Sequence, residues 1–173
     1  MNLMIRPINE GDPELISQSF QEQGWSKPAA QYEKYMEEHN LGLRYTFIAE
    51  LDGMFAGYVN VIWDSLYPHF KEHHIPEISD FNVLMKHQRA GIGSRLMDHA
   101  EAAISERSSF AGIGVGLFSD YGKAQILYVK RGYIPDGKGI FDGERYLQYG
   151  DQMTVNHDLA LYLTKRLGNE RLR

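Results

Sequence analysis

The sequence predicts an α/β fold of the α+β type, with a mixed, mostly antiparallel central sheet of about seven strands flanked by about four helices. Two observations predict it. The apolar runs at residues 44–51 and 54–63 are joined by Asp52-Gly53, a dipeptide typical of a two-residue hairpin turn between antiparallel strands. Further on, an apolar run is followed twice by a stretch of helical periodicity. A helix that connects two strands allows them to pair in parallel, so the sheet is expected to be mixed.

The first part of the chain predicts one strand and two helices ahead of this hairpin. The strand covers Leu3–Ile8, and Asp12-Pro13 supplies a capping residue and a proline for the first turn of a helix that ends at Gly24. Ser26 is expected to open the second helix, which ends at Gly42.

The segment from Asp64 to Pro76 is irregular, and we expect a surface loop or short helix there. It holds three of the seven histidines, His69, His73 and His74. No carboxylates stand at a clear ligand spacing from them, so we do not expect a metal site.

The second half predicts two strand-to-helix units. A strand at residues 77–85 leads through a glycine turn into a helix that ends near Ile104. The next strand contains Gly112, Gly114 and Gly116, which are expected to mark the close approach of another backbone or of a ligand.

The last part predicts one more helix and two closing strands. Ser119 or Asp120 can cap the helix, and Gly132 ends it. A late strand, a glycine-rich loop and a final strand at residues 159–167 follow, without a repeat or linker. We therefore expect residues 1–173 to form one domain.

Composition excludes several classes of protein. The chain has no cysteine, so disulfides, thiolate nucleophiles and thiolate metal sites are excluded, and a cytoplasmic location is expected. Neither a signal peptide nor a run of about 20 apolar residues is present, so we expect no membrane partner. A net charge of -5 disfavours nucleic acid and mildly favours a cationic substrate such as an amine.

The turn before the helix at residues 92–104 is a candidate anion site. Gly91 and Gly93 leave room beside the N-terminus of the helix, where free N–H groups and the helix dipole attract negative charge. The P-loop motif does not fit, because Ser94-Arg95 follows Gly93 without a lysine. The dinucleotide motif does not fit either, since it needs a third glycine at Leu96. A tight turn without a ligand is the alternative.

Two motifs together resemble a known family. Gln88 to Gly93 match the pattern Gln or Arg, two variable residues, Gly, one variable residue, Gly or Ala. The stretch AQILYVKRGY, residues 124–133, matches a second pattern with a Leu-Tyr pair followed by Gly and an aromatic residue. In this order and spacing they resemble the GNAT superfamily of N-acetyltransferases, whose order of elements is similar over nearly the whole chain.

The resemblance implies acetyl-CoA as cosubstrate. It implies that the glycine turn holds the pyrophosphate of acetyl-CoA, and that a neighbouring strand pairs with its pantetheine arm through backbone groups, one of which polarises the thioester carbonyl. An asparagine common in the family is Tyr121 here, which puts a side-chain contact to that arm in doubt. The implied cofactor-binding residues are Val83, Leu84, Met85, Gln88, Arg89, Ala90, Gly91, Ile92, Gly93, Ser94 and Asp120.

The resemblance also implies a general base for the attacking ammonium. In relatives a glutamate stands 14 residues before the first loop glycine, which is the position of Glu77, and Asp80 is the alternative. Strand alternation predicts that Glu77 and Asp80 lie on opposite faces, so that only one of them faces the acceptor. A solvated carboxylate at a strand end is the structural alternative for Glu77.

Tyr128 corresponds to the tyrosine that protonates the leaving CoA thiolate, and a buried core aromatic is its structural alternative. The implied function is transfer of an acetyl group to a primary amine by direct attack. A small molecule is the expected acceptor, and a peptide or protein is the second alternative. A catalytically inactive CoA-binding sensor of the same fold is the rival function, and the late strands are compatible with a homodimer.

Overall fold

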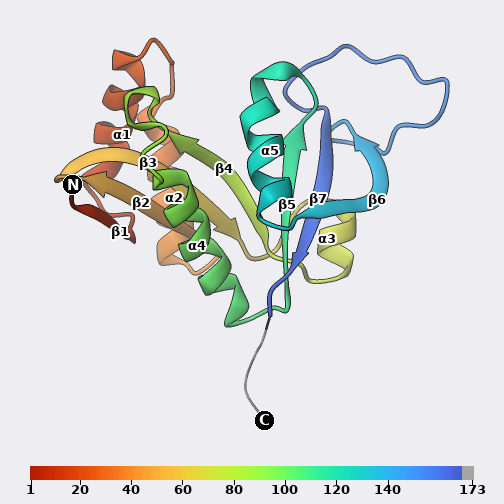
Figure 1. Ribbon diagram of the computed structural model, residues 1–173, viewed down its shortest axis with the longest axis horizontal. Coiled ribbons are helices and arrows are strands. Elements are labelled where there is room, and N and C mark those ends of the chain that lie inside the picture. Colours follow the sequence, from red (N-terminus) through yellow and green to blue (C-terminus); the bar gives the residue numbers. More distant parts are fainter. Residues whose placement is uncertain (169–173) are drawn as a thin grey trace.

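The computed structural model describes residues 1–168, so residues 169–173 of the expected domain lie outside the described residues. Within this part, seven strands form one sheet in the order β1-β2-β3-β4-β5-β7-β6 (Figure 1). They are β1 (Leu3–Pro7), β2 (Arg44–Leu51), β3 (Met54–Ile62), β4 (Glu77–Val83), β5 (Phe110–Gly116), β6 (Ile134–Phe141) and β7 (Ala160–Arg166). Only β4 and β5 pair in parallel, so the expected mixed, mostly antiparallel sheet is confirmed.

Helices cover both faces of the sheet. They are α1 (Asp12–Glu22), α2 (Ala29–Asn40), α3 (Pro68–Glu72), α4 (Ile92–Ser105) and α5 (Gly122–Lys130). The helices α4 and α5 pack on one face, called the α4 face below, and α1, α2 and α3 pack on the other, called the α2 face (Figure 1). The fifth helix is the short α3, in the segment for which a loop or short helix was expected.

Two helices begin later than the sequence predicted. The helix α2 starts at Ala29 instead of Ser26, because Pro28 is extended and forms the N-cap. The helix α5 starts at Gly122, because residues 119–121 form a separate 3₁₀ turn. The Asp52-Gly53 turn is as expected, with positive φ at both residues.

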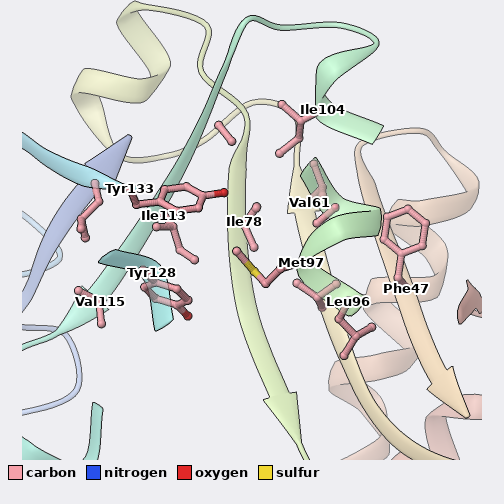
Figure 2. Close-up of a cluster of buried hydrophobic side chains, with 14 of the residues drawn as sticks. Phe47, Val61, Ile78, Leu96, Met97, Ile104, Ile113, Val115, Tyr128 and Tyr133 are labelled. Atoms are coloured by element: carbon pink, nitrogen blue, oxygen red, sulfur yellow. The ribbon is translucent and has the colours of Figure 1, made fainter. Parts of the chain in front are cut away.

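The larger core lies between the sheet and the helices of the α4 face. Figure 2 shows Leu96 and Met97 of α4 packed toward Val61 and Ile78 of the sheet, and Ile113 of β5 continues this layer. A second core on the α2 face joins α1 and α2 to β2 and β3. The residues of this second core are Ile8, Ile16, Phe20, Tyr32, Ile48, Phe55, Tyr58 and Leu84.

The strands β4 and β5 separate soon after they begin. Only Glu77 with Gly112 and Ile78 with Ile113 are paired, and beyond them the two strands diverge (Figure 1). The unpaired edges leave backbone N–H and C=O groups that require partners. The strand edges that are unpaired beyond Ile78 and Ile113, called the opening below, are edges with which an extended ligand can pair.

The glycines of β5 make room for aromatic rings instead of a ligand. A Cβ atom on Gly112 would lie 2.2 Å from Cε2 of the buried Phe70 ring, one on Gly114 would lie 2.9 Å from the ring of Tyr162, and one on Gly116 would meet Tyr121. The expected close approach is therefore made by side chains of the protein itself.

Gly112→Ala is expected to lower the free energy of unfolding by about 1–3 kcal/mol, because Phe70 has no free space into which to move. The matched control is Gly122→Ala, where a Cβ atom would meet nothing within 4 Å and the backbone is already helical. We expect this control to be neutral or to stabilise by up to about 1 kcal/mol. Urea denaturation of both variants measures the difference, and equal stabilities would contradict the packing argument.

Candidate active site

A β-bulge in β4 brings two carboxylates to the same face of the sheet. Tyr58 of β3 pairs with Asn82, whereas Asn60 pairs with Ser79, so β4 has an extra residue at this point. Asp80 lies in the bulge with a φ of 42°. The bulge interrupts the alternation of side chains. The prediction that Glu77 and Asp80 lie on opposite faces is therefore wrong, and both point to the α2 face.

The carboxylate of Asp80 joins the bulge to α2 and β3. Its Oδ2 atom accepts hydrogen bonds from Tyr35 OH (2.8 Å), Tyr58 OH (2.8 Å) and Gln31 Nε2 (3.2 Å), and its Oδ1 atom accepts one from Asn82 Nδ2 (2.9 Å). Lys27 Nζ lies 3.8 Å from Oδ1. A carboxylate has about four acceptor positions, so few remain for a substrate. Burial raises the pKa of Tyr35 and of Tyr58, which keeps both phenols protonated as donors.

Glu77 has a different environment at the start of β4. Its carboxylate accepts one hydrogen bond, from the buried Ser65 hydroxyl. Burial raises the pKa of Glu77, and the Ser65 hydrogen bond and the positive charge of Arg44 offset only part of this effect. A carboxylate whose pKa lies closer to neutrality is a better proton acceptor at neutral pH. The second acceptor oxygen of Glu77 has no hydrogen-bond partner within residues 1–168.

The glycine turn is shaped to hold an anion at the N-terminus of α4. Gly91 is the N-cap residue, with a φ of 77°, and Arg89 also has a positive φ of 65°. Within the described residues, none of the N–H groups of residues 89–94 donates to another backbone group. A Cβ atom on Gly93 would lie 3.0 Å from Cζ of Phe81, which explains why glycine stands there. These N–H groups converge on one end of a long helix, as an anion site requires.

The structure adds a cation to this turn that the sequence did not indicate. Lys123 of α5 donates a hydrogen bond from Nζ to Gln88 Oε1 over 3.1 Å. The residues are 35 positions apart, and neither motif includes the lysine. Its position beside the turn is decided by how α5 packs next to α4, and it supplies positive charge where a diphosphate would lie.

The three residues expected to pair with the pantetheine arm differ in how free their backbone is. The N–H of Leu84 donates to the carbonyl of Ala56 (2.9 Å), and the N–H of Met85 donates to Gln23 Oε1 (3.0 Å). Because successive residues of a strand point their backbone groups to opposite sides, Val83 is turned away from β3 and toward the opening. Of the three, Val83 is the residue whose backbone N–H can bind an extended ligand, and its carbonyl oxygen accepts a hydrogen bond from Gln88 Nε2 over 3.5 Å.

Tyr128 lies on α5, and it is only 6% exposed. In the view of Figure 2 its ring lies beside Ile113 and Val115 of β5, and its hydroxyl points from β5 toward β4. Burial raises the pKa of Tyr128, so the phenol is protonated at neutral pH. Its hydroxyl makes no hydrogen bond to the described residues, which leaves the O–H group available to a ligand in the opening.

Tyr121 stands where the family commonly has asparagine, and it contacts the loop between β6 and β7. Its hydroxyl lies 2.9 Å from His157 Nδ1, and its ring packs on Gly116. The neighbouring Asp120 is exposed in the 3₁₀ turn before α5. Neither is in the glycine turn.

Comparison with known proteins identifies the fold and its family. The family model described as Acetyltransferase (GNAT) family matches residues 13–133, which is more than half of the chain. The chain belongs to the GNAT acetyltransferase family. GNAT enzymes use acetyl-CoA as the acetyl donor, so the expected cosubstrate and the assignment as an acyltransferase are confirmed. No curated protein matches the chain significantly by sequence.

Solved structures of GNAT proteins share the whole fold. The structure of yncA from Salmonella typhimurium, determined with its cofactor acetyl-CoA, has a TM-score of 0.69, 15% identity and coverage of 100% of this chain and 98% of that one. A ribosomal-protein-alanine N-acetyltransferase from Brucella melitensis has a TM-score of 0.70, 17% identity and coverage of 95% and 99%. A chimera of the spermidine N-acetyltransferase SpeG from Vibrio cholerae with hSSAT has a TM-score of 0.68, 16% identity and coverage of 96% of both.

Among the described residues of this GNAT chain, no helix is both long and apolar enough to cross a bilayer. The cytoplasmic location and the homodimer expected from the sequence stay predictions.

Proposed function

We propose that this protein transfers the acetyl group of acetyl-CoA to a primary amine of a small molecule by direct attack on the thioester. The observation that carries the proposal is the bulge in β4, which turns Glu77 and Asp80 to the same face beside the opening between β4 and β5. Acetyl-CoA and the amine would then meet at this opening.

The free N–H groups of residues 89–94 support binding of the pyrophosphate there, with Lys123 beside it. The pantetheine arm would lie between the diverging strands and pair with Val83, as an added strand pairs with a free edge. An N–H group at the bulge would polarise the thioester carbonyl and stabilise the negative charge that forms on its oxygen. Asp120 is exposed near the start of α5, and we retain it as a contact for the same cofactor.

Glu77 is the better candidate for the general base. Its raised pKa and its single hydrogen bond leave it able to take a proton from the ammonium, directly or through a water molecule. Asp80 already accepts four hydrogen bonds, so we assign it a positioning role. Because Lys27 lies beside Asp80, Glu77 supplies the carboxylate that a compact cation would meet.

Tyr128 is the proposed general acid that protonates the CoA thiolate as it leaves. Tyr128→Phe keeps the ring and removes only the hydroxyl, so we expect kcat to fall about 10- to 100-fold while the Kd for acetyl-CoA and the Tm change little. Tyr133→Phe is the control, because its hydroxyl donates to Glu101 of α4, which also binds Arg131 and Lys165, so its loss should affect stability rather than turnover. Steady-state kinetics and calorimetric titration of both variants measure these effects. Unchanged kcat in Tyr128→Phe would assign that tyrosine to the core alone.

A small amine is favoured by the chemistry of the α2 face. Tyr35 donates a hydrogen bond to Asp80, and burial, followed by the charge of Glu77, raises the pKa of Tyr162. Aromatic rings and carboxylates together favour a cationic ligand. One structural neighbour, the SpeG chimera, is named as a spermidine N-acetyltransferase.

The test measures thiol release from acetyl-CoA in the presence of single amines. We would compare a diamine, spermidine, an aromatic primary amine and a peptide with a free amino terminus. Acceptor-dependent release with a small amine, at a higher kcat/KM than with the peptide, is the expected result. Release with the peptide alone would overturn the small-molecule acceptor, and tight acetyl-CoA binding without release in any mixture would favour the sensor.

A further inference from the structure

The short helix α3 brings together three side chains that can bind a metal. His69, Glu72 and His73 each offer one ligand atom, and these atoms all lie within 4.8 Å of one another. We propose that they form a binding site for a divalent transition-metal ion of the Zn²⁺, Ni²⁺ or Cu²⁺ class. The site is outside the acetyl-transfer machinery and does not depend on it.

The spacing of the two histidines follows helix geometry. Residues four positions apart project from the same side of a helix, and Glu72, three positions after His69, is their neighbour. The two imidazole rings have their centroids 4.4 Å apart. From the sequence we expected no carboxylate at a clear ligand spacing from the histidines, whereas the structure places a carboxylate oxygen of Glu72 within 4.8 Å of the ligand atoms of His69 and His73.

One imidazole is already oriented for binding. Nδ1 of His73 lies 2.9 Å from the carbonyl oxygen of His69. A carbonyl can only accept, so Nδ1 carries the proton and donates it, which leaves Nε2 of the neutral ring with its lone pair free. Metal-binding histidines are commonly held in this way through their other ring nitrogen.

The helix is short, but its attachment to the sheet is firm. Phe70 is fully buried against β5, in the space that Gly112 leaves open. Tyr67, just before the helix, stacks on Tyr162 with the ring centroids 3.6 Å apart. Its hydroxyl donates a hydrogen bond to Asp136 of β6 over 2.6 Å. These contacts hold α3 in place without the metal, so little ordering of the backbone is required on binding.

The third histidine is excluded from the group by the backbone. His74 has a φ of 52°, in the left-handed region, and it follows the C-cap of α3. The change of direction separates it from the other two, although it is adjacent to His73 in the sequence. His74 is therefore a matched control for the proposed site.

The chemistry of the ligands decides the class of metal. Two imidazoles and one carboxylate suit Zn²⁺, Ni²⁺ and Cu²⁺, whereas Mg²⁺ and Ca²⁺ prefer oxygen ligands only. Zinc bonds of about 2.0–2.1 Å in a tetrahedral arrangement put ligand atoms about 3.3 Å apart, which small side-chain rotations can reach from the present positions. Glu72 and His73 are exposed, so water molecules would complete the coordination.

The test titrates Zn²⁺ into protein that carries no affinity tag, by calorimetry, and repeats the titration with Mg²⁺. The expected result is one saturable Zn²⁺ site per chain and no Mg²⁺ binding. His69→Ala and His73→Ala should each weaken Zn²⁺ binding at least tenfold, Glu72→Gln should weaken it less, and His74→Ala should stay within twofold of the wild type. Melting curves without metal confirm that each variant is folded.

Electron paramagnetic resonance with one equivalent of Cu²⁺ provides a second readout. Coupling to two nitrogen nuclei, reduced to one in His69→Ala and in His73→Ala, would support the assignment. Zn²⁺ binding that is unchanged in both histidine variants, an equal loss in His74→Ala, or no saturable Zn²⁺ binding by the folded wild type would each overturn the proposal.

Discussion

Gly91→Glu is expected to abolish acetyl-CoA binding, which makes it the substitution with the largest effect on the cofactor. The new carboxylate would lie at the N-cap of α4, where the free N–H groups converge. Two unit charges 4 Å apart repel by about 4 kcal/mol at an effective dielectric constant near 20, and a pyrophosphate carries more than one. The Kd for acetyl-CoA should therefore rise by about a thousandfold or more in calorimetric titration.

The strain of this substitution is separated from its charge by a matched variant. Gly132, after α5, also has a left-handed backbone (φ +91°), and a Cβ atom there would meet nothing within 4 Å, as at Gly91. Gly91→Glu and Gly132→Glu should thus both lose about 1–3 kcal/mol of stability. Only the first should lose acetyl-CoA. Equal loss of binding in both, or normal binding in Gly91→Glu, would leave the glycine turn without a role in holding the cofactor.

Glu77→Gln is expected to lower kcat by about 100-fold or more, because the amide cannot take a proton from the ammonium. The Kd for acetyl-CoA should stay within twofold, since Glu77 is not part of the glycine turn. Glu106→Gln, an exposed position at the end of α4, is the control and should keep wild-type kinetics. If Glu77→Gln retains full activity and Asp80→Asn loses it, the roles assigned to the two carboxylates are reversed.

The pH dependence of the same reaction tests the environment of Glu77. A base acts only when it is deprotonated, so kcat/KM should fall as the pH drops through the raised pKa of Glu77. Ser65→Ala removes the hydrogen bond that lowers this pKa, and it should move the acid limb of the profile to higher pH. It also removes the acceptor of the Tyr67 N–H, so the variant should melt at a lower temperature. An acid limb that does not move would show that another group sets it.

The sequence alone determined the features that depend on local structure. Asp52-Gly53 has the backbone that a two-residue hairpin needs, and the glycines at 91 and 93 stand at the start of a helix, as their spacing predicted. Turns, the starts of helices and the positions of strands along the chain follow from residues that are close together in the sequence. The family resemblance rests on two short motifs, each of which is local in the sequence, and the match to the family model confirms it.

Only the tertiary structure decided which side chains meet. The bulge in β4 arises from how this strand pairs with β3, and it reverses the face of Asp80 that simple alternation predicted. The position of Lys123 beside Gln88 depends on the packing of two helices, and the glycines of β5 are explained by the aromatic rings that occupy the space beside them. Contacts between residues far apart in the chain depend on strand register and on packing. A sequence pattern with a period of two residues predicts neither of them.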